Sequence, residues 1–174
     1  MLADAALLSK VEQCIRIITD AYRNDKKVLF CGNGGSAADA QHLAAELSGR
    51  FYLDRPPLNA EALHVNSSFV TATANDHYFD SIYERMVDAV GKKGDVLVAL
   101  STSGNSKNIL RALKAAQSKG LHTIGLSGNT GGQMQALCQL VLNVPSSDTP
   151  RIQEMHMLLG HIICENVEQT LFQK

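Results

Sequence analysis

The apolar positions of the chain fall into short unbroken runs and longer runs with helical spacing. Leu7, Val11, Ile15 and Ile18 recur every three or four residues, which predicts a helix over residues 3–23. The short runs predict strands over residues 28–31, 60–65, 95–100, 121–126 and 140–144. Helical segments alternate with them at about 36–47, 69–74, 82–90, 107–119 and 151–172, with a short helix after residue 132. Alternating strands and helices predict an α/β fold with a parallel sheet covered on both faces.

We therefore expect a five-stranded parallel sheet flanked by helices, of the doubly wound, flavodoxin-like kind. At 174 residues the chain is long enough for one sizeable core, and no linker or low-complexity segment divides it. A single domain over residues 1–174 is the prediction. The helix within residues 1–26 is apolar over a broad face, and it suits core packing and packing against another subunit equally well.

Composition narrows the possible partners. The formal net charge of −1 gives no basic field for nucleic acid. No run approaches the length of a membrane span, and the N-terminus lacks the pattern of a signal peptide. Cys14, Cys31, Cys138 and Cys164 are widely spaced in apolar segments, which is typical of buried free thiols in a reducing compartment. A cytoplasmic protein with no membrane or nucleic-acid partner is the expectation.

Two polar loops follow predicted strands. Gly32, Gly34 and Gly35 allow close backbone approach where the first strand meets a helix, and Ser36 is positioned to cap that helix. The amide groups at such a helix start favour an anion, typically a phosphate. The first loop lacks the GxGxxG spacing of dinucleotide sites.

The second loop, residues 101–106, places four hydroxyls at a helix start. Hydroxyls and amides together form a neutral phosphate cradle, although the pattern alone suits a Ser/Thr-rich capping turn equally well. It lacks the Gly-Lys-Ser/Thr ending of a Walker A loop. Both loops follow strands of a parallel sheet, so both are expected at the edge formed by the strands' carboxyl ends.

His42 and Glu46 lie one helical turn apart, so they share a face of the helix that follows the glycines. Alone, such a pair is usually a surface salt link. His161, among apolar neighbours, would by itself more often be a core histidine. Their value as candidates depends on the phosphate-type loop that precedes the pair.

Three separated segments carry a family resemblance: residues 31–36 (CGNGGS), 101–106 (STSGNS) and 151–154 (RIQE). They resemble the signature segments of the sugar isomerase (SIS) family, and within it the chain is similar to the phosphoheptose isomerases. The likeness runs from about Lys27 into the C-terminal helix.

The resemblance implies that the chain interconverts sedoheptulose 7-phosphate and D-glycero-D-manno-heptose 7-phosphate, the first step towards ADP-heptose and the lipopolysaccharide core. It implies a homotetramer with active sites at subunit boundaries. The family's phosphate contacts fall on Ser101, Thr102, Ser103 and Ser106. Its sugar contacts fall on Asn33, Gly34, Gly35, Asn75, Asp76 and Gln153. Its zinc ligands, for one ion per subunit, fall on His42, Glu46, Gln153 and His161.

The residue types suit this chemistry. Moving a carbonyl from C2 to C1 requires that a proton leave one carbon and reach its neighbour through an enediol, and a carboxylate with an imidazole suits that exchange. We expect Glu46 to be the base and His161 the partner acid, with zinc polarising the carbonyl. Gln153 and His161 are about 12 Å apart along a straight helix. They reach one ion only if Gln153 lies at the start of the helix and both side chains lean inward, or if different subunits supply them.

Two alternatives stay open within the resemblance. The DnaA initiator-associating protein, a non-catalytic SIS tetramer, has a similar segment to residues 151–157 but lacks the glutamate and histidine found here as Glu46 and His161. Other phosphosugar SIS enzymes usually carry two SIS units in a longer chain. The retained pair favours the isomerase.

Overall fold

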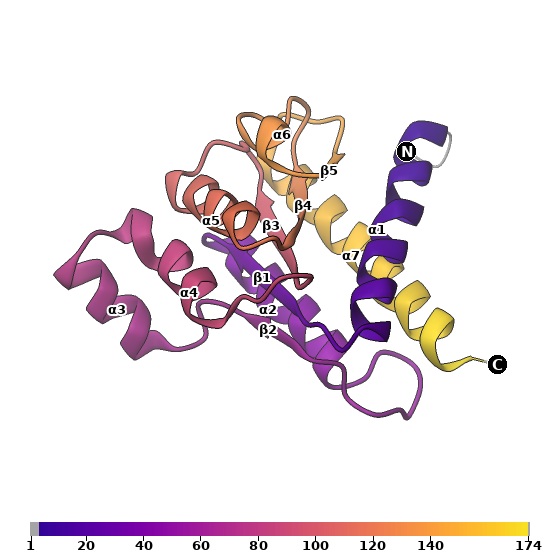
Figure 1. Cartoon of the computed structure of the whole chain (residues 1–174). Coiled ribbons are helices and arrows are strands. Elements are labelled where there is room, and N and C mark those ends of the chain that lie inside the picture. The colour runs from indigo at the N-terminus through magenta and orange to yellow at the C-terminus, as the bar shows by residue number, and fades with distance from the viewer. Residues whose placement is uncertain (1–3, 174) are drawn as a thin grey trace.

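The computed structural model describes residues 4–173. Its strands are β1 (Val28–Gly32), β2 (Ala60–Ala62), β3 (Val96–Ser101), β4 (His122–Ser127) and β5 (Leu140–Asn143). Its helices are α1 (Ala5–Arg23), α2 (Gly35–Ser48), α3 (Ser67–Asp76), the 3-10 helix η1 (Phe79–Ser81), α4 (Ile82–Val90), α5 (Lys107–Ser118), α6 (Met134–Leu137) and α7 (Thr149–Phe172). Strands and helices alternate as predicted (Figure 1).

The strands form one five-stranded parallel sheet in the order β2-β1-β3-β4-β5. Val28 pairs with Val96 and Gly32 with Leu100, so β1 and β3 are direct neighbours. The chain passes from β1 outward to β2 and then returns to add β3, β4 and β5 on the other side of β1. Strand order therefore reverses between β1 and β3, where doubly wound sheets bind ligands at the carboxyl ends. The predicted fold class is confirmed.

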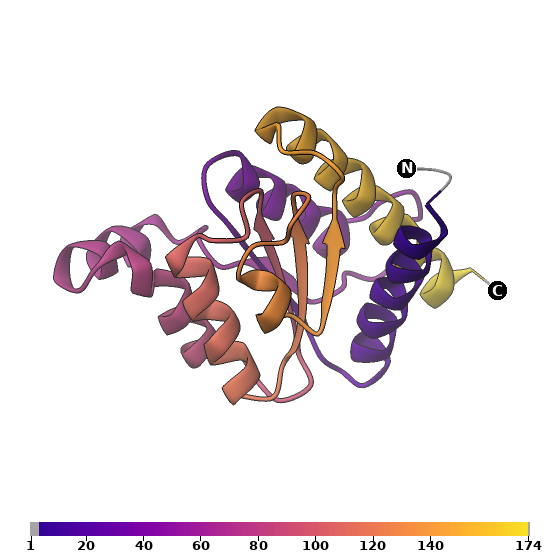
Figure 2. The ribbon, with the colours of Figure 1, turned by 90° about the horizontal axis from the view of Figure 1, so that it is seen from above.

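Alternate residues of each strand face opposite sides of the sheet and build two separate cores. Val28 and Phe30 pack on the side covered by α1, α2 and α7, whereas Leu29 and Cys31 pack on the side covered by α4, α5 and α6. Figure 2 shows the sheet between these two groups of helices. Burial on both faces is why the strands read as nearly continuous apolar runs in the sequence.

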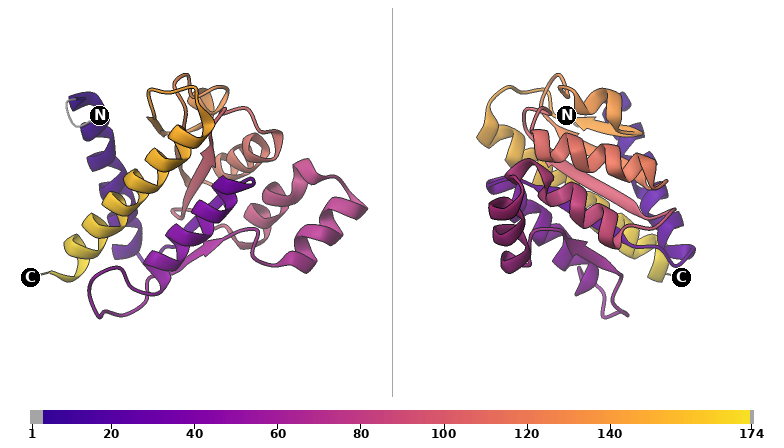
Figure 3. Two further views of the ribbon diagram at one scale, coloured as in Figure 1. Left: turned by 180° about the vertical axis from the view of Figure 1, so that it is seen from behind. Right: turned by 60° about the vertical axis from the view of Figure 1, so that its left-hand side comes forward.

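On one face α7 lies along α2, and α1 packs across α7 (Figure 3). The α2–α7 contact depends on Gly160, because a Cβ placed there would lie 2.5 Å from Cδ2 of Leu43. The missing side chain lets the two helices approach closely. The next residue on α7 is His161 and the preceding residue on α2 is His42, so this contact brings the two histidines to each other.

Two local predictions were wrong. Ser36 does not cap α2: the cap position is Gly34, without a side-chain bond, and Ser36 is buried inside the first turn. The helix expected at about 69–74, ending before Asn75 and Asp76, is longer: α3 begins at Ser67, behind the capping side chain of Asn66, and runs through Asp76. Among the helices of residues 4–173, none combines the length and apolarity needed to cross a bilayer.

Candidate active site

The glycine loop, residues 32–35, joins β1 to α2, and hydrogen bonds from Asn108 and Tyr83 hold it in place. Gly34 has φ of 56°, a left-handed conformation that favours glycine. The amides of Asn33 and Asn108 exchange hydrogen bonds of 2.9 and 2.8 Å. The Tyr83 hydroxyl donates to the carbonyl of Gly32. The loop is thus held in one conformation, with the first turn of α2 directly behind it.

The serine loop, residues 101–106, follows β3. The hydroxyls of Ser101 and Ser106 lie 3.2 Å apart, and the Ser127 hydroxyl donates to the Ser101 carbonyl at 2.7 Å, which fixes the base of the loop. Thr102 and Ser103 line a cavity of about 250 Å³. The predicted phosphate residues therefore divide into an inner hydroxyl pair and an outer pair that faces open space.

His42, Glu46 and His161 form a cluster between α2 and α7. Nε2 of His42 lies 3.0 Å from Oε1 of Glu46 and 3.2 Å from Nε2 of His161. One ligand atom from each of the three residues lies within 4.8 Å of the others. The helical pair predicted from the sequence does share a face, and α7 brings the second imidazole to it.

The donor set of this cluster fits a metal ion. A hydrogen on Nε2 of His42 can point to only one of its two neighbours, whereas a cation can accept lone pairs from all three residues. Tetrahedral zinc with bonds of about 2.1 Å separates its ligand atoms by about 3.4 Å. The distances of 3.0 and 3.2 Å from Nε2 of His42 are close to that separation.

The Gln153 side chain lies at the glycine loop. A Cβ built on Gly35 would come within 2.6 Å of its Nε2 atom, so the amide rests on the start of α2. Gly35 lies seven residues before His42 on the same helix. The structure thus brings together the two predicted sugar contacts Gln153 and Gly35, and the role of Gln153 as a metal ligand stays a prediction.

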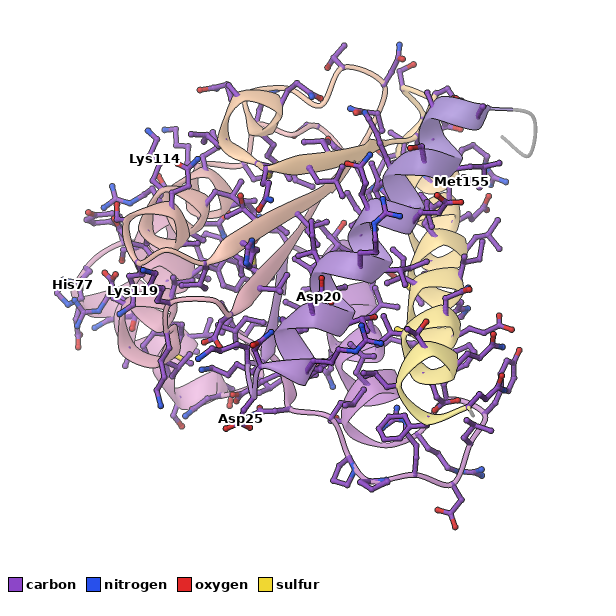
Figure 4. The ribbon with its side chains drawn as sticks, turned by 45° about the vertical axis from the view of Figure 1, so that its right-hand side comes forward. Asp20, Asp25, His77, Lys114, Lys119 and Met155 are labelled. Atoms are coloured by element: carbon purple, nitrogen blue, oxygen red, sulfur yellow. The ribbon has the colours of Figure 1, made fainter. Side chains whose placement is uncertain are left out.

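Asn75 and Asp76 lie at the end of α3, away from the His42–Glu46–His161 cluster. Both are exposed at the end of α3, where Nδ2 of Asn75 donates to Oδ1 of Asp76 at 2.8 Å. Figure 4 places the next residue, His77, on the opposite side of the molecule from α7. Within residues 4–173, no hydrogen bond or ion pair joins these two residues to the cluster, and their contact with a sugar stays a prediction.

Three interactions near the site were not predicted from the sequence: the Asn33–Asn108 pair, the Tyr83 bond to Gly32, and an ion pair between Arg55 and Glu168. Each joins residues more than 50 positions apart, so no local spacing reveals it. The sequence carried one signal for the ion pair: Glu168 lies one helical turn after the apolar Cys164 and so falls on the same, buried face of α7. A charge on a buried helix face needs a partner.

Comparison with known proteins agrees with this arrangement. The SIS domain family profile matches residues 3–128. The phosphoheptose isomerase of Clostridium acetobutylicum is 50% identical over 172 residues, covering 99% of this chain and 88% of that protein. That of Rhodospirillum rubrum is 53% identical over 161 residues, covering 92% and 86%.

Solved structures give the same result. The phosphoheptose isomerase of Neisseria gonorrhoeae superposes with a TM-score of 0.88 at 44% identity, covering 94% of this chain and 87% of that one. That of Francisella tularensis superposes with a TM-score of 0.91 at 36% identity, covering 95% and 88%. The chain belongs to the SIS domain family and, within it, to the phosphoheptose isomerases.

Proposed function

We propose that this chain converts sedoheptulose 7-phosphate to D-glycero-D-manno-heptose 7-phosphate. The observation that carries the proposal is the His42–Glu46–His161 cluster, in a chain 50% identical to a phosphoheptose isomerase over nearly its whole length. The reaction moves a carbonyl from C2 to C1. It therefore needs one group that moves a proton between the two carbons and one that gives a proton to O2 and takes one from O1.

Glu46 takes the proton from C1, and the electron pair of that C–H bond becomes the C1–C2 double bond of the enediol. His161 gives a proton to O2 as the C2 carbonyl opens. In the second half Glu46 gives its proton to C2, His161 takes the proton of O1, and C1 becomes the carbonyl. No proton is gained or lost overall, and a carboxylate with an imidazole suits both halves.

The substrate is held by the two loops. The hydroxyls of Ser101, Thr102, Ser103 and Ser106 bind the phosphate together with the free amides at the start of α5. The cavity beside Thr102 and Ser103 supports this assignment. Asn33, Gly34, Gly35, Asn75, Asp76 and Gln153 contact the sugar.

His42, Glu46 and His161 would hold one zinc ion per subunit, with Gln153 as a further ligand. When bound, zinc acts as a Lewis acid that polarises the carbonyl and stabilises negative charge on oxygen. A carboxylate has two oxygens and an imidazole has two ring nitrogens, so the ligand function and the proton-transfer function can fall on different atoms in Glu46 and in His161.

The proposal also covers the assembly of the chain, its location and the pathway that it serves. Residues 1–174 form a single SIS domain that assembles as a homotetramer in the cytoplasm and supplies heptose for the lipopolysaccharide core through ADP-heptose. Residues 1–26 contribute to subunit packing. Leu8 of α1 and Leu158 of α7 are large apolar side chains left exposed, which supports a further contact there.

The test is turnover of sedoheptulose 7-phosphate by the purified protein, with and without a chelator, beside Glu46→Gln and His161→Gln. We expect turnover that each substitution lowers by about 100-fold or more, that the chelator removes and that zinc restores. Glu84→Gln, on α4 away from the cluster, is the matched control. Absence of turnover even with zinc would contradict the proposal and favour the initiator-binding alternative, which a binding assay with the replication initiator then examines.

A further inference from the structure

Arg55, in the loop that follows α2, forms an ion pair with Glu168 of α7. Through Arg55 this pair joins the two helices that carry the His42–Glu46–His161 cluster. The Glu168 side chain is 1% exposed and that of Arg55 is 2% exposed. Nε of Arg55 donates to Oε2 of Glu168 at 2.8 Å. Because a buried charge is costly unless it is paired and hydrogen-bonded, the partners of each group show what the pair holds in place.

Glu168 fastens the loop of residues 49–59 to α7. Its carboxylate accepts backbone N–H bonds from Phe51, Tyr52 and Leu53 at 3.0, 2.7 and 2.9 Å. Burial acts to raise the pKa of Glu168, but these bonds and the guanidinium of Arg55 outweigh it and hold the pKa below its usual value. The carboxylate is therefore charged at neutral pH and binds the loop firmly.

Arg55 fastens the end of α2. Nη2 donates to the carbonyl of Glu46 at 3.0 Å, and Nη1 donates to the carbonyl of Leu47 at 2.9 Å. These carbonyls belong to the last turn of the helix, which has no further helical N–H groups to bond them and carries the negative end of the helix dipole. The backbone N–H of Leu58 also donates to the carbonyl of Leu47, at 3.2 Å. One guanidinium thus connects α7 directly to the backbone of Glu46.

The loop also places an aromatic ring on the cluster. The Phe51 ring lies 5.8 Å from the His161 ring at an interplanar angle of 50°. The backbone of Phe51 is held by Glu168, two helical turns after His161 on α7. Figure 3 shows this loop passing beside the end of α7.

We propose that the Arg55–Glu168 pair is a positioning device for the His42–Glu46–His161 cluster. It fixes the last turn of α2 against α7 and seats Phe51 on His161, so that the three ligand atoms stay convergent. A buried ion pair is weak evidence for stability, because apolar residues of similar volume often stabilise equally well. The planar guanidinium, however, bonds through Nε to Glu168 and through its two Nη atoms to the carbonyls at the end of α2, and this fork sets direction and distance. The inference rests on the proposed function insofar as it treats the cluster as a metal site.

The test compares Arg55→Lys and Glu168→Gln with Asp95→Asn. Lysine keeps the charge but lacks the fork that reaches Glu168 and the α2 carbonyls together. Glutamine turns one acceptor into a donor facing backbone N–H groups. Asp95 is an equally buried carboxylate that bonds instead to Lys27 and Lys92, ahead of β1 and β3.

The primary readout is the zinc dissociation constant, measured by competition with a chelator, beside the free energy of unfolding in urea. We expect Arg55→Lys and Glu168→Gln to raise the dissociation constant by about tenfold or more, as loss of ligand-supporting contacts does. Asp95→Asn should lower stability and leave the constant within about twofold, because it supports no ligand. Zinc dissociation constants equal to that of the wild type in all three variants would overturn the inference.

Two further measurements keep the outcome decisive. If either charge variant fails to fold, Phe51→Leu leaves the ion pair intact and should still weaken zinc binding. If the wild type binds zinc but turns over no heptose phosphate, the proposed reaction fails while the dissociation constants still judge the positioning role. If the wild type binds no zinc, the nuclear Overhauser contact between the Phe51 and His161 rings is the readout. Its survival in Arg55→Lys would overturn the inference.

Discussion

The Nε2 atoms of His42 and His161 lie 3.2 Å apart, although the residues are 119 positions apart in the sequence. Two rigid helices set this distance, since α2 and α7 touch through Leu43 and Gly160 beside the histidines. Imidazole nitrogens that face each other need a shared proton or a shared cation between them. The geometry of the cluster is therefore a property of helix packing, which makes it sensitive to substitutions at that contact.

Replacing Glu46 with glutamine should lower kcat by about 100-fold to 10,000-fold, the range in which a positioned base contributes. Glutamine keeps the size of the side chain but cannot accept a proton from carbon. Exchange of the C1 proton of the substrate with deuterated solvent, followed by NMR, measures the loss directly. Undiminished exchange in Glu46→Gln would assign the base to another residue.

Zinc should raise the melting temperature of the wild type. A ligand present at about 100 times its dissociation constant stabilises the folded state by about 2.7 kcal/mol. His42→Asn removes a ligand and should abolish most of the shift. His122→Asn is the control, because His122 is exposed at the start of β4 and bonds to Gln139. The same zinc-induced shift in His42→Asn as in the wild type would remove the cluster from metal binding.

Gly35→Ala should lower kcat/KM by about tenfold with little loss of stability. The three atoms nearest to the new Cβ all belong to the flexible end of the Gln153 side chain, with Nε2 at 2.6 Å, so the amide moves and the fold stays. Gln153→Ala should cause a similar loss. The two changes should not add in the double variant, because each removes the same contact. Additive losses would show that Gly35 and Gln153 act separately.

His156 should make the protein less stable in mild acid. It is fully buried, and burial lowers its pKa from 6.5 to about 4. Between about pH 6.5 and pH 4 the imidazole is protonated in the unfolded chain but neutral in the folded chain. The stability that the neutral, buried His156 contributes is therefore complete above about pH 6.5 and is lost as the pH falls towards 4. Linkage puts the loss at about 2 kcal/mol at pH 5.

Urea unfolding of the wild type and of His156→Leu at pH 7 and pH 5 measures this effect. The wild type should lose about 2 kcal/mol more than the variant between the two pH values. Equal losses would mean that His156 is protonated in the folded protein at pH 5.

Much of the fold follows from local pattern. The strands were predictable because burial on both faces leaves unbroken apolar runs, and parallel connectivity then brings the glycine and serine loops to one edge. Helix starts were less predictable. Ser36 looked like a cap, but Gly34 takes that position because it adopts a positive φ, which moves Ser36 into the helix.

The candidate site was only partly predictable. The His42–Glu46 pair follows from helical spacing, and His161 came from family resemblance. Arg55 and Glu168 are 113 positions apart, and such long-range hydrogen bonds leave no periodic signal. The placement of Gln153 on Gly35 depends on where α7 begins and how it packs along α2, which spacing along one helix cannot give.

The His42–Glu46–His161 cluster is only partly buried, with 49% of the His42 side chain and 24% of the Glu46 side chain exposed. Its members contribute little to the apolar core, and they are separate from the loops that follow β1 and β3. A descendant chain can therefore exchange these residues while it keeps its fold and its glycine and serine loops. Loss of chemistry and loss of ligand recognition are separable steps in the evolution of such a protein, and the first of them needs very few mutations.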